Sequence, residues 1–223
     1  MVPFAKAYHY MTGCPLAKLD SDPTEPSPLA AWFQTHMLDL FVDMFEHRDY
    51  LKASEQFTER LKAVEEHERV YDRKLKIRLF QGAGVLASLF INQHADVPIK
   101  RVGEFVHSGM EADVHLSRIK PNRMLELIWF VFEPKLPDIR MQDVWYHYCQ
   151  WNARAYELKF EQRPYHLTLY YPMIGESIQF QYNTEGRFEV IADLINSEVF
   201  YANPSKTRCS VCRRCPEYLR MMI

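Results

Sequence analysis

The segment "MLELIWFVFEP", residues 124–134, constrains the fold more than any other part of the chain. Its apolar run is nearly continuous, and a strand with apolar side chains on both sides must be covered on both faces. Two shorter segments, "IKRVGEFVHSG" (99–109) and "MEADVHLSRI" (110–119), precede it and read as strands that meet at a Ser-Gly turn. The three segments predict a sheet whose third strand is buried in the centre.

Helical spacing of apolar residues dominates most of the remaining chain. Two further extended segments read as strands, at 165–172 and 177–182. The expected helices span 28–47, 54–70, 76–92, 140–160 and 187–202. Because the order is helices, three strands, a helix, two strands and a helix, we expect an α/β fold: a mixed sheet flanked by helices, with an N-terminal helical addition.

Composition indicates one domain. A chain of 223 residues that is 48% hydrophobic can bury one substantial core. We divide residues 1–223 into an N-terminal and helical part (1–95), a sheet core (96–203) and a tail (204–223). The Pro-rich connector "DSDPTEPSP", residues 20–28, separates the first thirteen or so residues from the rest of the chain.

Charge and hydropathy exclude some classes of protein. The net charge of -2 gives no overall attraction to nucleic acid, so such binding would need a local basic surface. No window approaches eighteen consecutive apolar residues, and the N-terminus lacks the order of a signal peptide. We therefore expect no membrane partner and a cytoplasmic, intracellular location.

Three of the five cysteines fall within the segment "CSVCRRC" near the end of the chain: Cys209, Cys212 and Cys215. In a reducing compartment an odd number of cysteines favours thiolate chemistry over disulfides. This spacing therefore indicates metal ligation by the clustered thiolates.

A second candidate site lies on the predicted sheet. Asp113 is in the second strand, and the third strand is expected to end in Glu133-Pro134-Lys135, with Glu133 and Lys135 on one face. Carboxylates from neighbouring strands suit Mg²⁺ or Mn²⁺, and a lysine beside them can stabilise charge on a phosphate. The same residues could also form a solvated edge or a surface ion pair.

The helix after this strand adds a third motif. Gln142 and Tyr146 are four residues apart and project from one helix face. The order of Asp113, Glu133-Pro134-Lys135 and Gln142 to Tyr146 resembles the D...(D/E)xK...QxxxY signature of the RecB-like branch of the PD-(D/E)XK nucleases. The segment "AYHYMTGCP", residues 7–15, also looks like the N-terminal segment of that branch, where a lone cysteine precedes a proline.

The resemblance implies a restriction-endonuclease-like core and a metal-dependent deoxyribonuclease, with exonuclease activity on DNA ends or single strands. It implies that Asp113, Glu133 and the Pro134 carbonyl bind Mg²⁺ or Mn²⁺. Lys135 would then assist the attacking water, and Gln142 and Tyr146 would orient the substrate. Protein partners in recombination, repair or CRISPR adaptation are implied as well, and a phage or virus could encode such an enzyme.

In a subset of these nucleases, including CRISPR spacer-acquisition nucleases and the AddB type, four cysteines hold a [4Fe-4S] cluster. The resemblance implies that Cys14 joins Cys209, Cys212 and Cys215 around such a cluster, with a structural role. The x2 spacing between Cys212 and Cys215 is shorter than in most of the family, so a Cys₄ zinc site is the alternative. Cys149, in an apolar helix, reads as a buried structural thiol.

A further departure from the family keeps another function open. Where many RecB-like enzymes carry a metal-binding histidine after Gly-x-x-x, this chain reads "GAGVLASLF" with Leu86. Glu104 matches an acidic position that some members have, whereas His107 and His115 read as packed or solvent-facing side chains. The alternative function is a catalytically inactive nuclease-fold protein that binds nucleic acid or scaffolds a complex. A third alternative is a protein of unrelated function that is stabilised by a zinc site.

Overall fold

The computed structural model describes residues 2, 4–13, 28–47, 55–56, 59, 62, 99–183 and 188–197. The predicted helix at 76–92 lies outside these residues, as does most of the one at 54–70. The described elements are α1 (Phe4–Thr12), α2 (Pro28–His47), β1 (Ile99–His107), β2 (Met110–Ile119), β3 (Leu125–Phe130), α5 (Ile139–Phe160), β4 (Pro164–Tyr171), β5 (Glu176–Gln181) and α6 (Phe188–Asn196).

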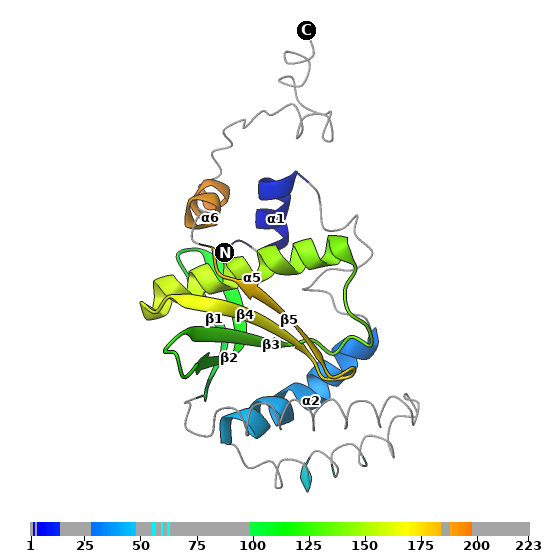
Figure 1. Cartoon of the computed structure of the whole chain (residues 1–223). Helices are drawn as coiled ribbons and strands as arrows, with labels where there is room; N and C mark the ends of the chain where they lie inside the picture. Colours follow the sequence, from blue (N-terminus) through cyan, green and yellow to red (C-terminus); the bar gives the residue numbers. More distant parts are fainter. Residues whose placement is uncertain are drawn as a thin grey trace.

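The five strands form one mixed sheet in the order β1-β2-β3-β4-β5. Neighbouring strands are antiparallel except β3 and β4, which run parallel and are connected through α5. Figure 1 shows α5 on one face of the sheet and α2 on the other. The predicted α/β arrangement of a mixed sheet flanked by helices is confirmed.

The central strand β3 is buried along its whole length, as its apolar run predicts. Leu127 and Trp129 belong to the core cluster shared with α5. On the opposite face, Phe130 packs against Phe41 of α2, with ring centroids 5.7 Å apart. Alternating side chains therefore serve two separate buried layers, and this is why all but one of the strand's side chains are apolar.

One expectation about β3 is wrong. The strand ends at Phe130, so Glu133, Pro134 and Lys135 lie in the following loop and not on the strand. Just beyond the strand, the Val131 amide donates to the Tyr170 carbonyl over 2.7 Å. Proline has no amide to continue such pairing. Strand alternation therefore does not fix which way the Glu133 and Lys135 side chains point.

The hairpin between β1 and β2 is confirmed. Ser108 and Gly109 both have positive φ, 49° and 73°, as the two-residue turns of type I′ require. The Val2 amide donates to the Gly109 carbonyl, and Val2 forms a parallel bridge with Met110. The N-terminus is thereby attached to the tip of this hairpin.

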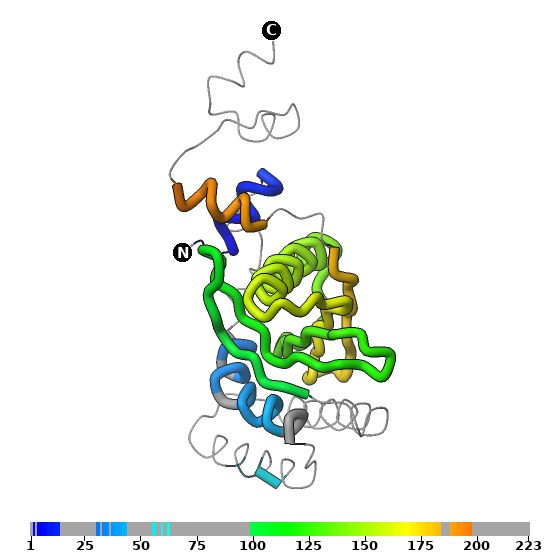
Figure 2. The backbone as a smooth tube through the Cα atoms, turned by 90° about the vertical axis from the view of Figure 1, so that its left-hand side faces the viewer, coloured from blue at the N-terminus to red at the C-terminus, as the bar shows by residue number. Residues whose placement is uncertain are grey.

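The first residues are not set apart from the rest of the fold. Helix α1 buries Phe4, Ala7 and Tyr8, and the Phe4 ring meets Tyr148 of α5 edge-on at 5.3 Å. Helices α1 and α6 contact each other and lie side by side at the end of the molecule where the chain begins (Figure 2). The sequence did not predict that α1 packs against α5 and α6. The Pro-rich connector that follows α1 suggested a separate segment instead.

Candidate active site where β2 leaves β3

The pairing between β2 and β3 covers only part of β2. It runs from Ile119↔Leu125 to Leu116↔Ile128 and then stops. On its other side β2 stays paired with β1, and Asp113 is opposite Glu104. Asp113 therefore lies where β2 has separated from β3 and remains in a two-stranded arm with β1.

Where β2 separates from β3, side chains take the place of the backbone hydrogen bonds that would otherwise join the two strands. The Trp129 indole N–H donates to the Asp113 carbonyl over 2.6 Å, and the Asp113 amide donates to Asn152 Oδ1 over 2.7 Å. The Phe130 amide donates to His115 Nδ1 over 2.8 Å. Buried backbone groups need hydrogen-bond partners. These three contacts supply them without closing β2 onto β3.

The Asp113 carboxylate is partly open to solvent. Its side chain is 31% exposed, and Oδ2 lies 3.5 Å from His115 Nε2. Because His115 Nδ1 accepts an amide hydrogen, the neutral ring carries its proton on Nε2, facing Asp113. His115 is buried and stacks on Phe130, so of the two expected environments, packed or solvent-facing, it has the packed one.

Two side chains outside the predicted catalytic set, Glu104 and Tyr148, also lie near Asp113. Glu104 is the cross-strand neighbour of Asp113. Burial raises the pKa of Tyr148, and the charges of Asp113 and Glu104 raise it further. The Tyr148 phenol of α5 therefore stays protonated and can donate a hydrogen bond. Its position depends on how α5 crosses the sheet, which no local motif encodes.

The Glu133-Pro134-Lys135 motif lies in the loop that leads from β3 to α5. Glu133 is half-buried, whereas Pro134 and Lys135 are exposed. Burial raises the pKa of Tyr171, and the nearby Glu133 charge adds to this, which places Glu133 near the end of β4. Within the described ranges, no three His, Cys, Asp or Glu side chains gather closely enough to hold a metal ion.

Gln142 and Tyr146 occupy the first turns of α5, as predicted. The helix begins with Asp138, whose carboxylate accepts the Met141 amide over 2.9 Å. Gln142 Nε2 donates to the Pro137 carbonyl over 3.1 Å, so its side chain is tied to the loop that carries Glu133. Tyr146 packs edge-on against Phe180 of β5. Neither of these contacts involves Asp113, which Asn152 of the same helix touches directly.

The predicted cluster ligands Cys14, Cys209, Cys212 and Cys215 lie outside the described residues. Cys149 is described, and its thiol is free and buried. Burial raises its pKa well above the ordinary value, which makes the thiol inert at neutral pH. The interpretation of Cys149 as a structural thiol is confirmed.

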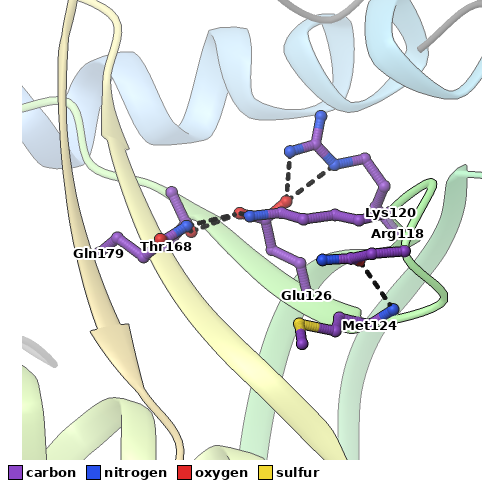
Figure 3. A network of polar contacts seen from close by, with 7 residues as sticks. Arg118, Lys120, Met124, Glu126, Thr168 and Gln179 are labelled. Carbon is purple, nitrogen blue, oxygen red and sulfur yellow. Dashed lines mark hydrogen bonds and ion pairs between the residues drawn. The ribbon is translucent and has the colours of Figure 1, made fainter. Parts of the chain in front are cut away.

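A buried ionic network at the other end of β3 was not predicted. The Glu126 carboxylate is 1% exposed. It accepts hydrogen bonds from Arg118 and Thr168 and forms an ion pair with Lys120 at 3.3 Å, and Gln179 completes the network (Figure 3). The signal in the sequence was a single acid inside the apolar run "LELIWF". Because the carboxylate is satisfied by these partners, we assign it a structural role.

Compared with models of known families, with curated proteins and with solved structures, the chain shows no significant match. Among the helices that the structure describes, none combines the length and apolar character needed to cross a bilayer.

Proposed function

We propose that this chain is a metal-dependent deoxyribonuclease with a restriction-endonuclease-like core. One observation carries the proposal: Asp113 presents a partly exposed carboxylate where β2 leaves β3, with its backbone held on both sides by buried side chains. A partly exposed carboxylate at the point where two strands diverge is accessible to a ligand from solvent.

The donor atoms available near this opening fit a hard cation. The β2–β3 pairing ends at Leu116↔Ile128, three residues from Asp113 on β2, and Glu133 lies in the loop that follows β3. Mg²⁺ is commonly held by one or two carboxylates, with water and substrate phosphate completing its shell. Asp113 and Glu133, with the Pro134 carbonyl, form such a set of oxygen donors. When bound, the cation would polarise the phosphodiester and lower the pKa of an attacking water.

The remaining roles fall to side chains of the chain itself. His115 Nε2–H orients the Asp113 carboxylate from one side. Lys135 is exposed and within the same loop as Glu133, where an ammonium can stabilise charge on a phosphate or orient the water. Gln142 fixes that loop to the first turn of α5 through Pro137. In this proposal Gln142 and Tyr146 orient the DNA strand.

We further propose that Cys14, Cys209, Cys212 and Cys215 hold a structural [4Fe-4S] cluster. The adjacency of α1 and α6 supports it, because α1 ends at Thr12, just before Cys14, and α6 leads into the C-terminal segment. A cluster joining these segments would close almost the whole chain into a loop and stabilise the folded state.

The test of nuclease function uses end-labelled linear DNA, single- and double-stranded, beside closed circular DNA, with Mg²⁺, Mn²⁺ or EDTA. We expect the wild-type protein to degrade linear DNA only with a divalent cation. Asp113→Asn, Glu133→Gln and Lys135→Ala should each lower the rate by about 100-fold or more. Asp193→Asn, an exposed acid on α6, is the matched control and should keep the wild-type rate.

Degradation that continues in EDTA, or that survives in both Asp113→Asn and Glu133→Gln, would overturn this proposal. Equal DNA binding by wild-type and variant proteins, without cleavage under any condition, would identify an inactive binding or scaffolding protein. Cleavage of closed circles would show an endonuclease in place of the expected exonuclease.

A further inference from the structure

We infer that Asn152 and Trp129 are positioning residues that set the Asp113 carboxylate in place for a divalent cation. This inference rests on the proposed nuclease function and deepens it. Neither residue was a candidate site residue in the sequence, and neither is expected to touch the cation or the DNA. Their effect would pass through the backbone of Asp113.

Both contacts converge on the same residue. Asn152 is 1% exposed and Trp129 is 2% exposed, so each hydrogen bond is shielded from water on the side of its buried partner. Asn152 accepts the amide hydrogen of Asp113, and Trp129 donates to the carbonyl of Asp113. The two peptide groups that flank the Asp113 Cα are thus fixed independently, one from α5 and one from β3.

The orientation of Asn152 is itself fixed. Its Nδ2 donates to the Tyr148 carbonyl one helical turn earlier, over 2.7 Å. Because that contact requires a donor, Oδ1 must be the atom that faces the Asp113 amide. The side chain therefore uses both ends of its amide group, and it links the position of Asp113 to the α5 backbone.

The two hydrogen bonds from Asn152 and Trp129 form a clamp on the Asp113 backbone. This clamp determines the position at which the Asp113 carboxylate leaves β2. With both flanking peptide groups held, the Cα–Cβ direction of Asp113 is set, and its Oδ2 then lies 3.5 Å from His115 Nε2. Without Asn152 or Trp129, the amide or carbonyl of Asp113 would lose its hydrogen-bond partner, and the direction of the Cα–Cβ bond would no longer be fixed from both sides. Partners that orient metal ligands in this way commonly change metal affinity by about 10–100-fold when mutated.

The chain offers close controls for both residues. Gln150, two residues earlier on α5 and 2% exposed, makes the same kind of clamp on β5. It donates to the Gln181 carbonyl over 2.7 Å and accepts the Asn183 amide over 2.9 Å. Trp151 donates its indole N–H to the Glu111 carbonyl of β2 over 2.8 Å. Both resemble the proposed residues in burial and bonding but do not contact Asp113 in these bonds.

The experiment measures Mn²⁺ affinity by titration calorimetry on the full chain, with thermal unfolding and DNA cleavage kinetics alongside. We expect Asn152→Leu and Trp129→Phe to weaken Mn²⁺ binding by about tenfold or more. The Mn²⁺ concentration for half-maximal cleavage should rise in parallel, while KM for DNA changes by less than about twofold. Gln150→Leu and Trp151→Phe should lower the unfolding midpoint similarly but leave Mn²⁺ affinity within about twofold of wild type.

Three results separate the outcomes. Wild-type Mn²⁺ affinity in both Asn152→Leu and Trp129→Phe overturns the inference, as does an equal loss in the two controls, which would show a merely structural role. If Asp113→Asn binds Mn²⁺ as the wild type does, the proposed function itself fails. Trp129→Phe removes only the indole N–H and keeps an aromatic ring, so it decides the matter if Asn152→Leu does not fold.

Discussion

Glu126 shows how a buried strand can contain a charged side chain when that side chain has enough polar partners. Its carboxylate receives Arg118 Nε at 2.8 Å and the Thr168 hydroxyl at 2.6 Å, with Lys120 Nζ 3.3 Å away. Desolvation raises the pKa of Glu126, but attraction to Arg118, the Thr168 hydrogen bond and attraction to Lys120 together outweigh it. The resulting pKa lies below its ordinary value of 4.5.

This lowered pKa makes stability depend on pH in a defined direction. The folded state binds the Glu126 proton more weakly than the unfolded state, so the stabilisation is complete above about pH 4.5 and is lost as pH falls through the folded value. Glu126→Gln should lower the free energy of unfolding at pH 7 by about 3–5 kcal/mol because Arg118 loses its buried counter-charge. The difference from wild type should narrow below about pH 4.5.

Urea unfolding at a series of pH values measures both effects. Glu189→Gln is the control, because Glu189 also has a lowered pKa, caused chiefly by its hydrogen bond from Arg154, but its side chain is 30% exposed. Its loss should cost less than about 1 kcal/mol. A wild-type to Glu126→Gln difference that stays constant from pH 7 to about pH 3 would contradict the assignment of Glu126 as a charged partner.

At the scale of elements, α5 connects most of the fold. It bonds to β2 through Asn152 and Trp151, and to β5 through Gln150. Arg154 connects it to α6, donating from Nη2 to Glu189 over 2.8 Å. A shift of α5 along its axis would therefore disturb the candidate site and the α1–α6 end of the molecule together.

The ends of α5 predict opposite effects on stability. Asp138→Ala removes the side chain that accepts the Met141 amide, and it should destabilise the protein by about 1 kcal/mol. Glu161 ends the helix in the left-handed conformation, with φ 55°, and its side chain is exposed. Glu161→Gly should therefore be neutral or stabilising by up to about 1 kcal/mol, since glycine adopts this conformation without strain. Chemical denaturation compares the two, and a destabilised Glu161→Gly would argue against the left-handed cap.

At the scale of the whole molecule, the four-cysteine proposal connects the two ends of the chain. Anaerobically purified protein should be brown, absorb broadly near 400 nm, and contain about four irons per chain. Cys14→Ala should lose the iron and unfold at a lower temperature. Cys149→Ala is the matched control and should retain the iron, because its thiol is buried in the core and is not a proposed ligand.

Metal analysis separates the alternatives. A colourless protein with about one zinc per chain would replace the iron cluster by a Cys₄ zinc site. Iron that persists in Cys14→Ala would remove Cys14 from the ligand set. In both cases the nuclease proposal would then depend on Asp113, Glu133 and Lys135 alone.

The sequence by itself determined those helices and strands whose buried faces follow from the local spacing of apolar residues. The apolar run around Trp129 specified a strand covered on both faces, helical spacing specified α2 and α5, and Ser108-Gly109 specified the hairpin turn. Each of these follows from side-chain spacing within a few residues, which fixes the faces of one element.

Only the tertiary structure decided what stands next to Asp113. The end of the β2–β3 ladder, the clamp from Asn152 and Trp129, and the partners of Glu126 all join residues distant in sequence. Likewise, β3 ended before Glu133 because strand length depends on the partner strand as well as on the apolar run. The spacing of apolar residues indicates whether a side chain is buried. Contacts between elements determine which side chains lie next to one another, and the candidate site depends on these contacts.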